Sequence, residues 1–226
     1  MKKIIDFDEV SAKEYDLWYQ TEKGKYISSL ENKLMVDLLK PQTGQKLLDI
    51  GCGTGNHLLY FLEKNLFVYG IDSSYSMLKE AEKKTSGKKV VINAGAQSLP
   101  FLDKSFDISI IFTTLEFCDD PVSVLKEAER VTREKIYLGV LNSFSFTSAL
   151  RRIKGWFKFS IYNRARFYSI WKLKRMFSYS FNFSSIQWGG VGFFPWVHFS
   201  FFRWIDKKTS FKRNPFSTFL GILIKL

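Results

Sequence analysis

The chain of 226 residues has few cysteines, few histidines and no long apolar run. Its two cysteines, Cys52 and Cys118, exclude a disulfide framework and favour a reducing compartment. Two histidines without ligand spacing argue against a metal site. The best apolar segment, Val191–Ile205, is shorter than the roughly 18 residues of a membrane span and contains His198 and Arg203. Because the first residues contain no apolar signal segment, we expect a cytoplasmic protein that is at most peripheral at the membrane.

Acidic residues are nearly absent from the last part of the chain. Residues 141–226 contain one of the 22 Asp and Glu residues, but 15 of the 34 Lys and Arg residues and 24 of the 39 aromatic residues. Interleaved basic and aromatic residues are typical of surfaces that bind a lipid surface, a nucleic acid or an acidic small molecule. The alternative is that Lys and Arg side chains border an aromatic core.

Short apolar runs alternate with helical patterns along the chain. The predicted strands are Lys46–Ile50, Phe67–Ile71, Lys89–Asn93, Asp107–Phe112, Lys135–Leu141, Phe183–Trp188 and Phe216–Lys225. The predicted helices are a segment that Asp8 or Ser11 caps and that ends at Tyr19, and Tyr26–Leu39, Asn56–Lys64, Ser74–Lys84, Pro121–Thr132, Ser143–Lys154 and Phe167–Tyr179. Strand–helix units of about twenty residues predict an α/β protein with a mainly parallel, doubly wound sheet and helices on both faces.

The strongest motif is the segment Leu47–Asn56, in which a buried strand leads through three glycines into a helix. Gly51, Gly53 and Gly55 allow a tight turn and let bare backbone contact a ligand. A dinucleotide site has its third small residue three places after the second glycine, and Asn56 occupies that place. A phosphate-binding P-loop has Gly-Lys-Ser/Thr at the helix start, which is absent here.

Two carboxylates accompany this loop and indicate the charge of its ligand. Asp49 precedes the loop, where it would repel a pyrophosphate and attract a cation such as the sulfonium or ammonium group of S-adenosylmethionine. Asp72 ends the next predicted strand, 21 residues after Gly51, where a carboxylate can accept hydrogen bonds from both hydroxyls of a ribose. Together they predict a site for a positively charged nucleoside.

Four motifs follow one another across residues 44–141. They are Leu47–Asn56, Gly70-Ile71-Asp72, Ser98–Phe101 with Ser105–Asp107, and Glu127–Val131. In this order they resemble the motifs of class I S-adenosylmethionine-dependent methyltransferases, in the type-11 group. The resemblance implies a Rossmann-like sheet of seven strands, mostly parallel with the last strand antiparallel, and S-adenosylmethionine bound at the carboxyl ends of the first strands. Because the sequence contains no repeat, low-complexity tract or domain-length linker, we expect a single domain over residues 1–226, with an N-terminal helical lid (1–43), a cofactor-binding core (44–141) and an acceptor side (142–226).

The resemblance further implies which residues contact the cofactor. They are Asp49, Gly51, Cys52, Gly53, Gly55, Asp72, Ser73, Ala96, Gln97, Thr113, Tyr15, Trp18 and Tyr19. The three aromatic residues lie in a lead segment, Tyr15–Gly24, that resembles one in a subgroup of these enzymes; they can face the sulfonium, or pack an amphipathic helix on the sheet. The chain departs from the family at Gly95, where an Asp usually meets the adenine amino group, and Gln97 can accept that hydrogen bond instead.

Methyl transfer depends on alignment and exclusion of water, and the chain shows no catalytic triad. Glu116 is a candidate base or positioning carboxylate, with a structural role as the alternative. His57 is a candidate acceptor contact, or else a packing or capping residue. We predict a small-molecule or lipid-like acceptor, and contact of the basic C-terminal part with an anionic membrane surface. The alternatives are an RNA methyltransferase, although no Asn/Asp-Pro-Pro-Tyr/Phe element is present, and a noncatalytic S-adenosylmethionine-binding protein.

Overall fold

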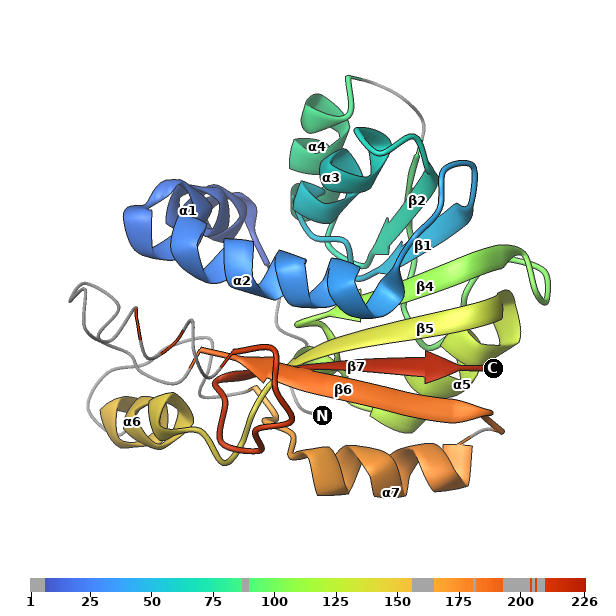
Figure 1. Ribbon diagram of the computed structural model, residues 1–226. Helices are drawn as coiled ribbons and strands as arrows, with labels where there is room; N and C mark the ends of the chain where they lie inside the picture. Colours follow the sequence, from blue (N-terminus) through green and yellow to red (C-terminus); the bar gives the residue numbers. More distant parts are fainter. Residues whose placement is uncertain are drawn as a thin grey trace.

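The computed structural model describes residues 7–86, 90–155, 165–180, 182–192, 204, 206 and 210–226. In this part of the chain the strands form a seven-stranded sheet in the order β3-β2-β1-β4-β5-β7-β6 (Figure 1). The strands are β1 Lys46–Ile50, β2 Phe67–Asp72, β3 Val91–Asn93, β4 Phe106–Phe112, β5 Thr132–Leu141, β6 Ser185–Val191 and β7 Phe219–Lys225. β1 to β5 run parallel, and β7 is antiparallel to both β5 and β6. The predicted fold is therefore confirmed.

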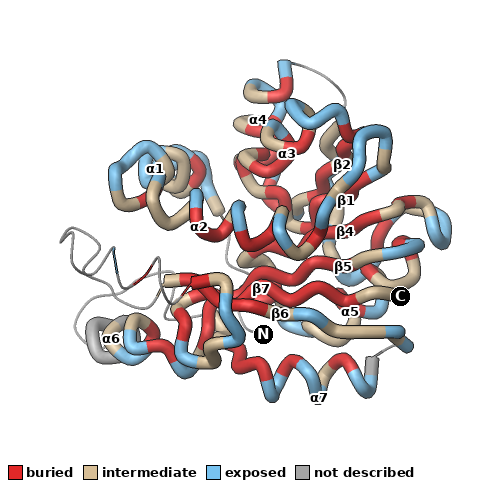
Figure 2. Tube along the Cα trace, in the orientation of Figure 1, coloured by how far each residue is buried: buried red, intermediate tan, exposed pale blue. Residues whose placement is uncertain are grey.

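Helices cover both faces of this sheet. They are α1 Glu9–Gln20, α2 Glu22–Leu39, α3 Asn56–Leu62, α4 Tyr75–Lys84, the 3-10 helix η1 Leu115–Phe117, α5 Pro121–Val131, α6 Phe146–Gly155 and α7 Ile170–Ser180. Buried residues of α2, α3 and α4 pack on one face, and those of α5 and α7 pack on the other. Successive residues of β1 point to opposite faces. Leu47 therefore packs with α2, α3 and α4, and Leu48 packs with α5 and α7. Figure 2 shows the buried sheet between these two layers.

The two N-terminal helices begin at side-chain caps. α1 follows Asp8, whose carboxylate accepts the Ser11 N–H at 2.8 Å, so Asp8 is the cap of the two that the sequence allowed. α2 begins at Glu22, four residues before the predicted Tyr26, because the hydroxyl of Thr21 caps it. The two helices therefore follow each other with a single residue between them.

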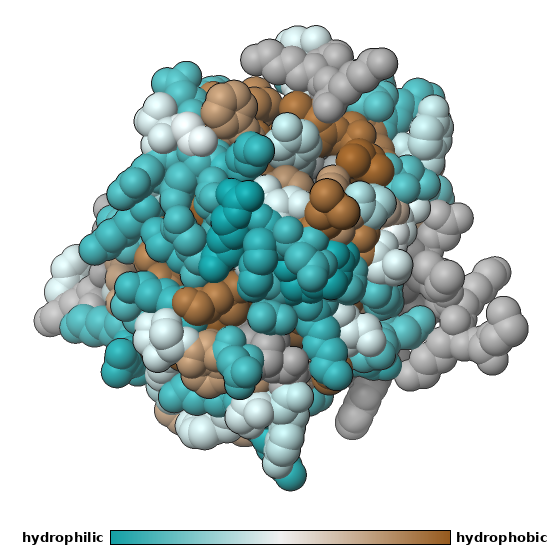
Figure 3. Space-filling model, turned by 90° about the vertical axis from the view of Figure 1, so that its right-hand side faces the viewer, coloured by the Kyte–Doolittle hydropathy of each residue, from teal (hydrophilic) through white to brown (hydrophobic). Residues whose placement is uncertain are grey.

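The carboxyl ends of the parallel strands lie along one edge of the sheet, at the left in Figure 1. The register aligns Asp49 of β1 with Gly70 of β2, and Asp72 ends β2 two residues later. Hydrophilic side chains predominate on the opposite side of the molecule, with apolar side chains in its upper part and in smaller patches below (Figure 3). In open α/β sheets of this kind, ligands bind at the carboxyl ends of the strands, so we expect the site in the loops along this edge.

The C-terminal elements agree with the predicted ones, with shifted boundaries. α6 begins at Phe146, three residues after the predicted start, and β6 extends to Val191. Most of the apolar segment Val191–Ile205 lies outside the described residues. Among the helices that the structure describes, none is long and apolar enough to cross a membrane.

Candidate cofactor site

The glycine-rich segment between β1 and α3 forms a tight loop at the carboxyl edge. Gly51, Gly53 and Gly55 have positive φ angles of 78°, 52° and 77°, a conformation that favours glycine. A Cβ at Gly51 would collide with the Thr114 side chain, whereas a Cβ at Gly53 would meet nothing within 4 Å. Gly51 is therefore required by packing, while Gly53 presents bare backbone to open space that a ligand can enter.

The end of β2 holds this loop in place. Gly51 N donates to the Ile71 carbonyl at 2.8 Å. The Asp72 carboxylate accepts hydrogen bonds from Gly53 N at 2.9 Å and from Ser74 N at 2.8 Å. Asp72 thereby fixes both the loop and the start of α4, and each of its oxygens can accept a further hydrogen bond.

Asp49 is a buried carboxyl group without a partner. The residue is 1% exposed, and neither carboxyl oxygen has a hydrogen-bond partner among the residues that the structure describes. Burial and, to a lesser degree, the negative charge of Asp72 raise the pKa of Asp49 to about 8. Burial also raises the pKa of Asp72. An unpartnered buried carboxyl group destabilises the fold, and a cationic ligand beside the loop would supply its missing partner.

These residues fit the expected S-adenosylmethionine. Asp49 would pair with its cationic groups, and Asp72 would accept hydrogen bonds from the ribose hydroxyls. The open space at Gly53 leaves backbone accessible to the nucleoside. The structure thus places the two predicted carboxylates near the carboxyl ends of neighbouring strands, next to the glycine loop.

The other predicted cofactor contacts lie in the loop and beyond the ends of β2, β3 and β4. Ser73 and Gln97 are exposed, and Ala96 and Thr113 are half-buried. Thr113 has a φ angle of 47°, and its N–H donates to a β5 carbonyl at 2.8 Å. Burial raises the pKa of the Cys52 thiol, so Cys52 offers backbone groups rather than a thiolate. All of these residues lie at the carboxyl edge, and their contacts with the cofactor stay predictions.

Helix α1 contacts the glycine loop and carries the predicted aromatic lid residues. The hydroxyls of Tyr15 and Tyr19 are 3.0 Å apart, and the Trp18 ring packs edge-on against Tyr19 with centroids 5.0 Å apart. The hydroxyl of Thr54, in the loop, donates to Asp16 of α1 at 2.6 Å. The structure therefore brings α1 to the loop, and the cation–π role of its aromatic residues stays a prediction.

The two candidate catalytic residues are buried. Oε1 of Glu116, in η1, accepts the Leu141 N–H at 2.6 Å, and no described residue forms a hydrogen bond with Oε2. Burial raises the pKa of Glu116 to about 8, so its carboxyl group is mostly protonated at neutral pH. His57 packs on the Phe112 ring with centroids 4.2 Å apart, and burial lowers its pKa to about 4, which keeps the imidazole neutral. Their roles in methyl transfer stay predictions.

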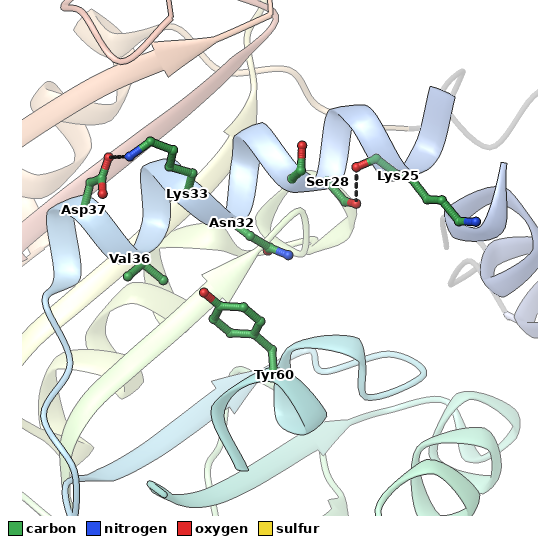
Figure 4. A pocket seen from close by; sticks show the side chains of 8 residues that line it. Lys25, Ser28, Asn32, Lys33, Val36, Asp37 and Tyr60 are labelled. Atoms are coloured by element: carbon green, nitrogen blue, oxygen red, sulfur yellow. Dashed lines mark hydrogen bonds and ion pairs between the residues drawn. The ribbon is translucent and has the colours of Figure 1, made fainter. Parts of the chain in front are cut away.

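An open cavity of about 500 Å³ lies elsewhere, between α2 and α3 (Figure 4). Its lining includes Lys25, Asn32 and Tyr60, but none of the predicted cofactor residues. The Lys33 ammonium at its edge forms an ion pair with Asp37 at 2.7 Å. The cavity is therefore separate from the glycine loop and its carboxylates.

Comparison with known proteins agrees with this geometry. Residues 48–138, from β1 to β5, match the methyltransferase domain family model Methyltransf_11. The segment from β1 to β5 therefore belongs to the type-11 group of methyltransferase domains. Its cofactor is S-adenosylmethionine, the ligand that Asp49, Asp72 and the glycine loop fit.

Relatives with known sequences match this chain over part of its length. An uncharacterized protein of Methanocaldococcus jannaschii is 37% identical over 137 residues, which are 60% of this chain and 61% of that protein. A demethylmenaquinone methyltransferase of Geobacillus stearothermophilus is 38% identical over 99 residues, which are 41% of this chain and 42% of that enzyme. The chain thus matches less than two thirds of either relative.

A solved structure shows the same fold over nearly the whole chain. It is an S-adenosylmethionine-dependent methyltransferase of Thermotoga maritima, described as a possible histamine N-methyltransferase. The two structures have a TM-score of 0.74 and 24% sequence identity, and the match covers 96% of each chain. The fold is therefore shared well beyond the segment that the family model matches.

The polar residues that hold the loop to its neighbours were not predicted from the sequence. The Thr114 hydroxyl donates to the Gly51 carbonyl at 3.2 Å. Lys84 of α4 donates to Asp16 and to Thr54, which are far from it in sequence. Of these residues, only Thr54 could have been expected at the site from the sequence, because it lies between Gly53 and Gly55.

Proposed function

We propose that this protein transfers the methyl group of S-adenosylmethionine to a small-molecule or lipid-like acceptor. The observation that carries the proposal is Asp49, a buried carboxyl group that directly precedes a glycine loop and has no hydrogen-bond partner in the described part of the chain. A cationic nucleoside satisfies this carboxylate, whereas a neutral or anionic nucleotide does not. S-adenosylmethionine, when bound, supplies an electrophilic methyl group on sulfur.

The residues of the site bind and align rather than react. Gly53 and Asp72 hold the nucleoside, and Asp49 gives up its proton to pair with the positive charge. α1 reduces access of water to the loop that it contacts. The Glu116 carboxyl group is mostly protonated at neutral pH. It therefore donates a hydrogen bond to the methyl acceptor and so orients that molecule.

Exposed aromatic side chains beyond β5 support an apolar acceptor. Phe144 and Phe146 follow β5 and are 55% and 49% exposed. The Phe144 ring packs edge-on against the exposed ring of Trp171, with centroids 5.5 Å apart. The name of the Geobacillus relative, demethylmenaquinone methyltransferase, points to an acceptor of the quinone class.

The outward face of α7 supports contact with an anionic membrane surface from the cytoplasm. Leu173 and Phe177 of this helix are buried in the core. Its exposed side chains combine three cations with two aromatic rings: Trp171, Lys172, Lys174, Arg175 and Tyr179. Such a face suits the headgroup region of an anionic bilayer. The same cations also suit RNA phosphates, so RNA methylation is the second candidate function.

Calorimetric titration with S-adenosylmethionine tests the cofactor. The wild-type protein should bind it, and Asp72→Ala should weaken binding at least about tenfold, because one good charge-assisted hydrogen bond contributes about 1.5–3 kcal/mol. A folded wild-type protein that does not bind would contradict the proposal. Binding without methylated product from any quinone or lipid acceptor would favour the noncatalytic alternative.

Sedimentation with vesicles tests the membrane surface. Vesicles of phosphatidylserine and phosphatidylcholine should bind the protein, and a variant with Lys172→Gln, Lys174→Gln and Arg175→Gln should bind less. The matched control removes three exposed cations elsewhere, with Lys64→Gln, Lys79→Gln and Lys83→Gln. Equal binding to vesicles with and without phosphatidylserine would contradict this contact, and filter binding to RNA that falls steeply with salt would favour the second candidate.

A further inference from the structure

The N-terminal segment touches the loops after three neighbouring strands. After β2, Ser74 Oγ donates to the Phe7 carbonyl at 2.7 Å. After β4, Phe117 packs edge-on against the Phe7 ring with centroids 5.5 Å apart. After β1, Thr54 Oγ1 donates to Asp16 Oδ1 at 2.6 Å. Because these loops build the cofactor site, the segment from Phe7 to Asp16 runs across it, at the edge where Figure 1 shows α1.

Lys84, at the end of α4, joins this segment to the loop. Its ammonium donates to Asp16 Oδ1 and Asn56 Oδ1, both at 2.7 Å, and to Thr54 Oγ1 at 3.1 Å. Three donors are all that a lysine has, so each is used on α1 or on the loop and its helix. The Lys84 and Asp16 side chains are 24% and 20% exposed, and Thr54 is fully buried. Solvent and salt therefore screen this pair less than a surface ion pair.

A second ion pair between the same two helices differs in burial and in position. Lys79 Nζ of α4 lies 3.0 Å from Glu9 Oε1 of α1. Both side chains are more than half exposed, at 51% and 62%, and the pair shows no hydrogen bond to the glycine loop. Only the Lys84 pair joins α1 and α4 to Thr54 among the described contacts. The Lys79 pair therefore attaches α1 to α4 alone, whereas the Lys84 pair also attaches α1 to the glycine loop.

We propose that Lys84, acting through Asp16 and Thr54, is a positioning residue that latches α1 over bound S-adenosylmethionine. The inference rests on the proposed function, in which this loop binds the cofactor. Release of the ligand past α1 requires the Lys84–Asp16 pair to separate, because Asp16 holds α1 to Thr54 between the two glycines. The latch therefore slows dissociation of the cofactor and of its demethylated product, S-adenosylhomocysteine.

The test measures the dissociation rate and Kd of S-adenosylhomocysteine, with hydrogen exchange of the α1 amides as a readout that needs no acceptor. Lys84→Met should raise the dissociation rate about tenfold and speed exchange in α1, in the bound as well as the free protein. Lys84→Arg, which keeps the charge, should restore most of the slow dissociation. Asp16→Asn should change the rate in the same direction as Lys84→Met. Adding it to Lys84→Met should have less than the additive effect, because the two residues form one pair.

Lys79→Met is the matched control and should leave the dissociation rate within about twofold of the wild type. An equal effect of Lys79→Met and Lys84→Met would overturn the latch, since both would then act only by attaching α1. An unchanged dissociation rate in Asp16→Asn would also overturn the latch. This variant keeps the proposal testable if Lys84→Met does not fold. A wild-type protein that does not bind S-adenosylhomocysteine would instead refute the proposed function.

Discussion

Replacing Asp49 with Asn should stabilise the ligand-free protein and weaken its binding of cofactor. The pKa of Asp49 rises from 3.8 to about 8 in the folded state, because the group is buried and, to a lesser degree, because Asp72 is negatively charged. As pH rises above 3.8, the unfolded chain loses the Asp49 proton while the folded chain keeps it. The folded state therefore loses stability by about 1.4 kcal/mol per pH unit between pH 3.8 and pH 8.

At pH 7 this loss amounts to about 4 kcal/mol, and an asparagine avoids it. The asparagine brings an amide NH₂ group into the same buried position, which costs about 1–3 kcal/mol if it finds no acceptor. The net expectation is that Asp49→Asn is more stable by about 1–3 kcal/mol at pH 7 and loses this advantage near pH 4. Urea unfolding of both proteins from pH 4 to pH 8 measures the difference. Parallel stability profiles for the two proteins would refute the reasoning.

Cofactor binding gives a second measure of the same carboxyl group. When a cationic ligand pairs with Asp49, the group ionises and releases close to one proton at pH 7, because its pKa lies near 8 beforehand. Calorimetry in buffers of different ionisation enthalpy counts this proton. Asp49→Asn should release none and should bind S-adenosylmethionine more weakly. Binding without proton release in the wild type would mean that Asp49 does not meet the positive charge.

Three further predictions separate packing from binding. Gly51→Ala should lower Tm, measured by thermal unfolding, because its Cβ collides with Thr114. Gly53→Ala should bind the cofactor more weakly by calorimetry, and its positive φ angle should cost about 1–2 kcal/mol of stability. Gly95→Asp should fold normally, because a Cβ there meets only the Gln97 amide oxygen at 3.6 Å, and should bind S-adenosylmethionine more tightly; weaker binding would place adenine elsewhere. Glu116→Gln should leave cofactor Kd unchanged and lower the transfer rate, and an unchanged rate in a methylation assay would assign Glu116 a structural role.

Local patterns in the sequence predicted most of this fold. The alternation of strands and helices, the cap at Asp8 and the turn at the three glycines all depend on residues a few positions apart. Their periodicity and backbone preferences are therefore visible in the chain itself. The two carboxylates were predictable for a similar reason, since parallel neighbouring strands bring their carboxyl ends to one edge. The identity of the cofactor follows from these local signals.

Tertiary structure alone decided the properties that set the chemistry of the site. Nothing next to Asp49 in the sequence shows that both its oxygens lack partners, because that isolation arises from burial by surrounding strands and loops. The contact of Lys84 with Asp16 joins residues 68 positions apart and follows from how α1 and α4 pack. The position of β7 between β5 and β6 depends likewise on long-range pairing. Such contacts form between residues distant in sequence, so no local pattern encodes them.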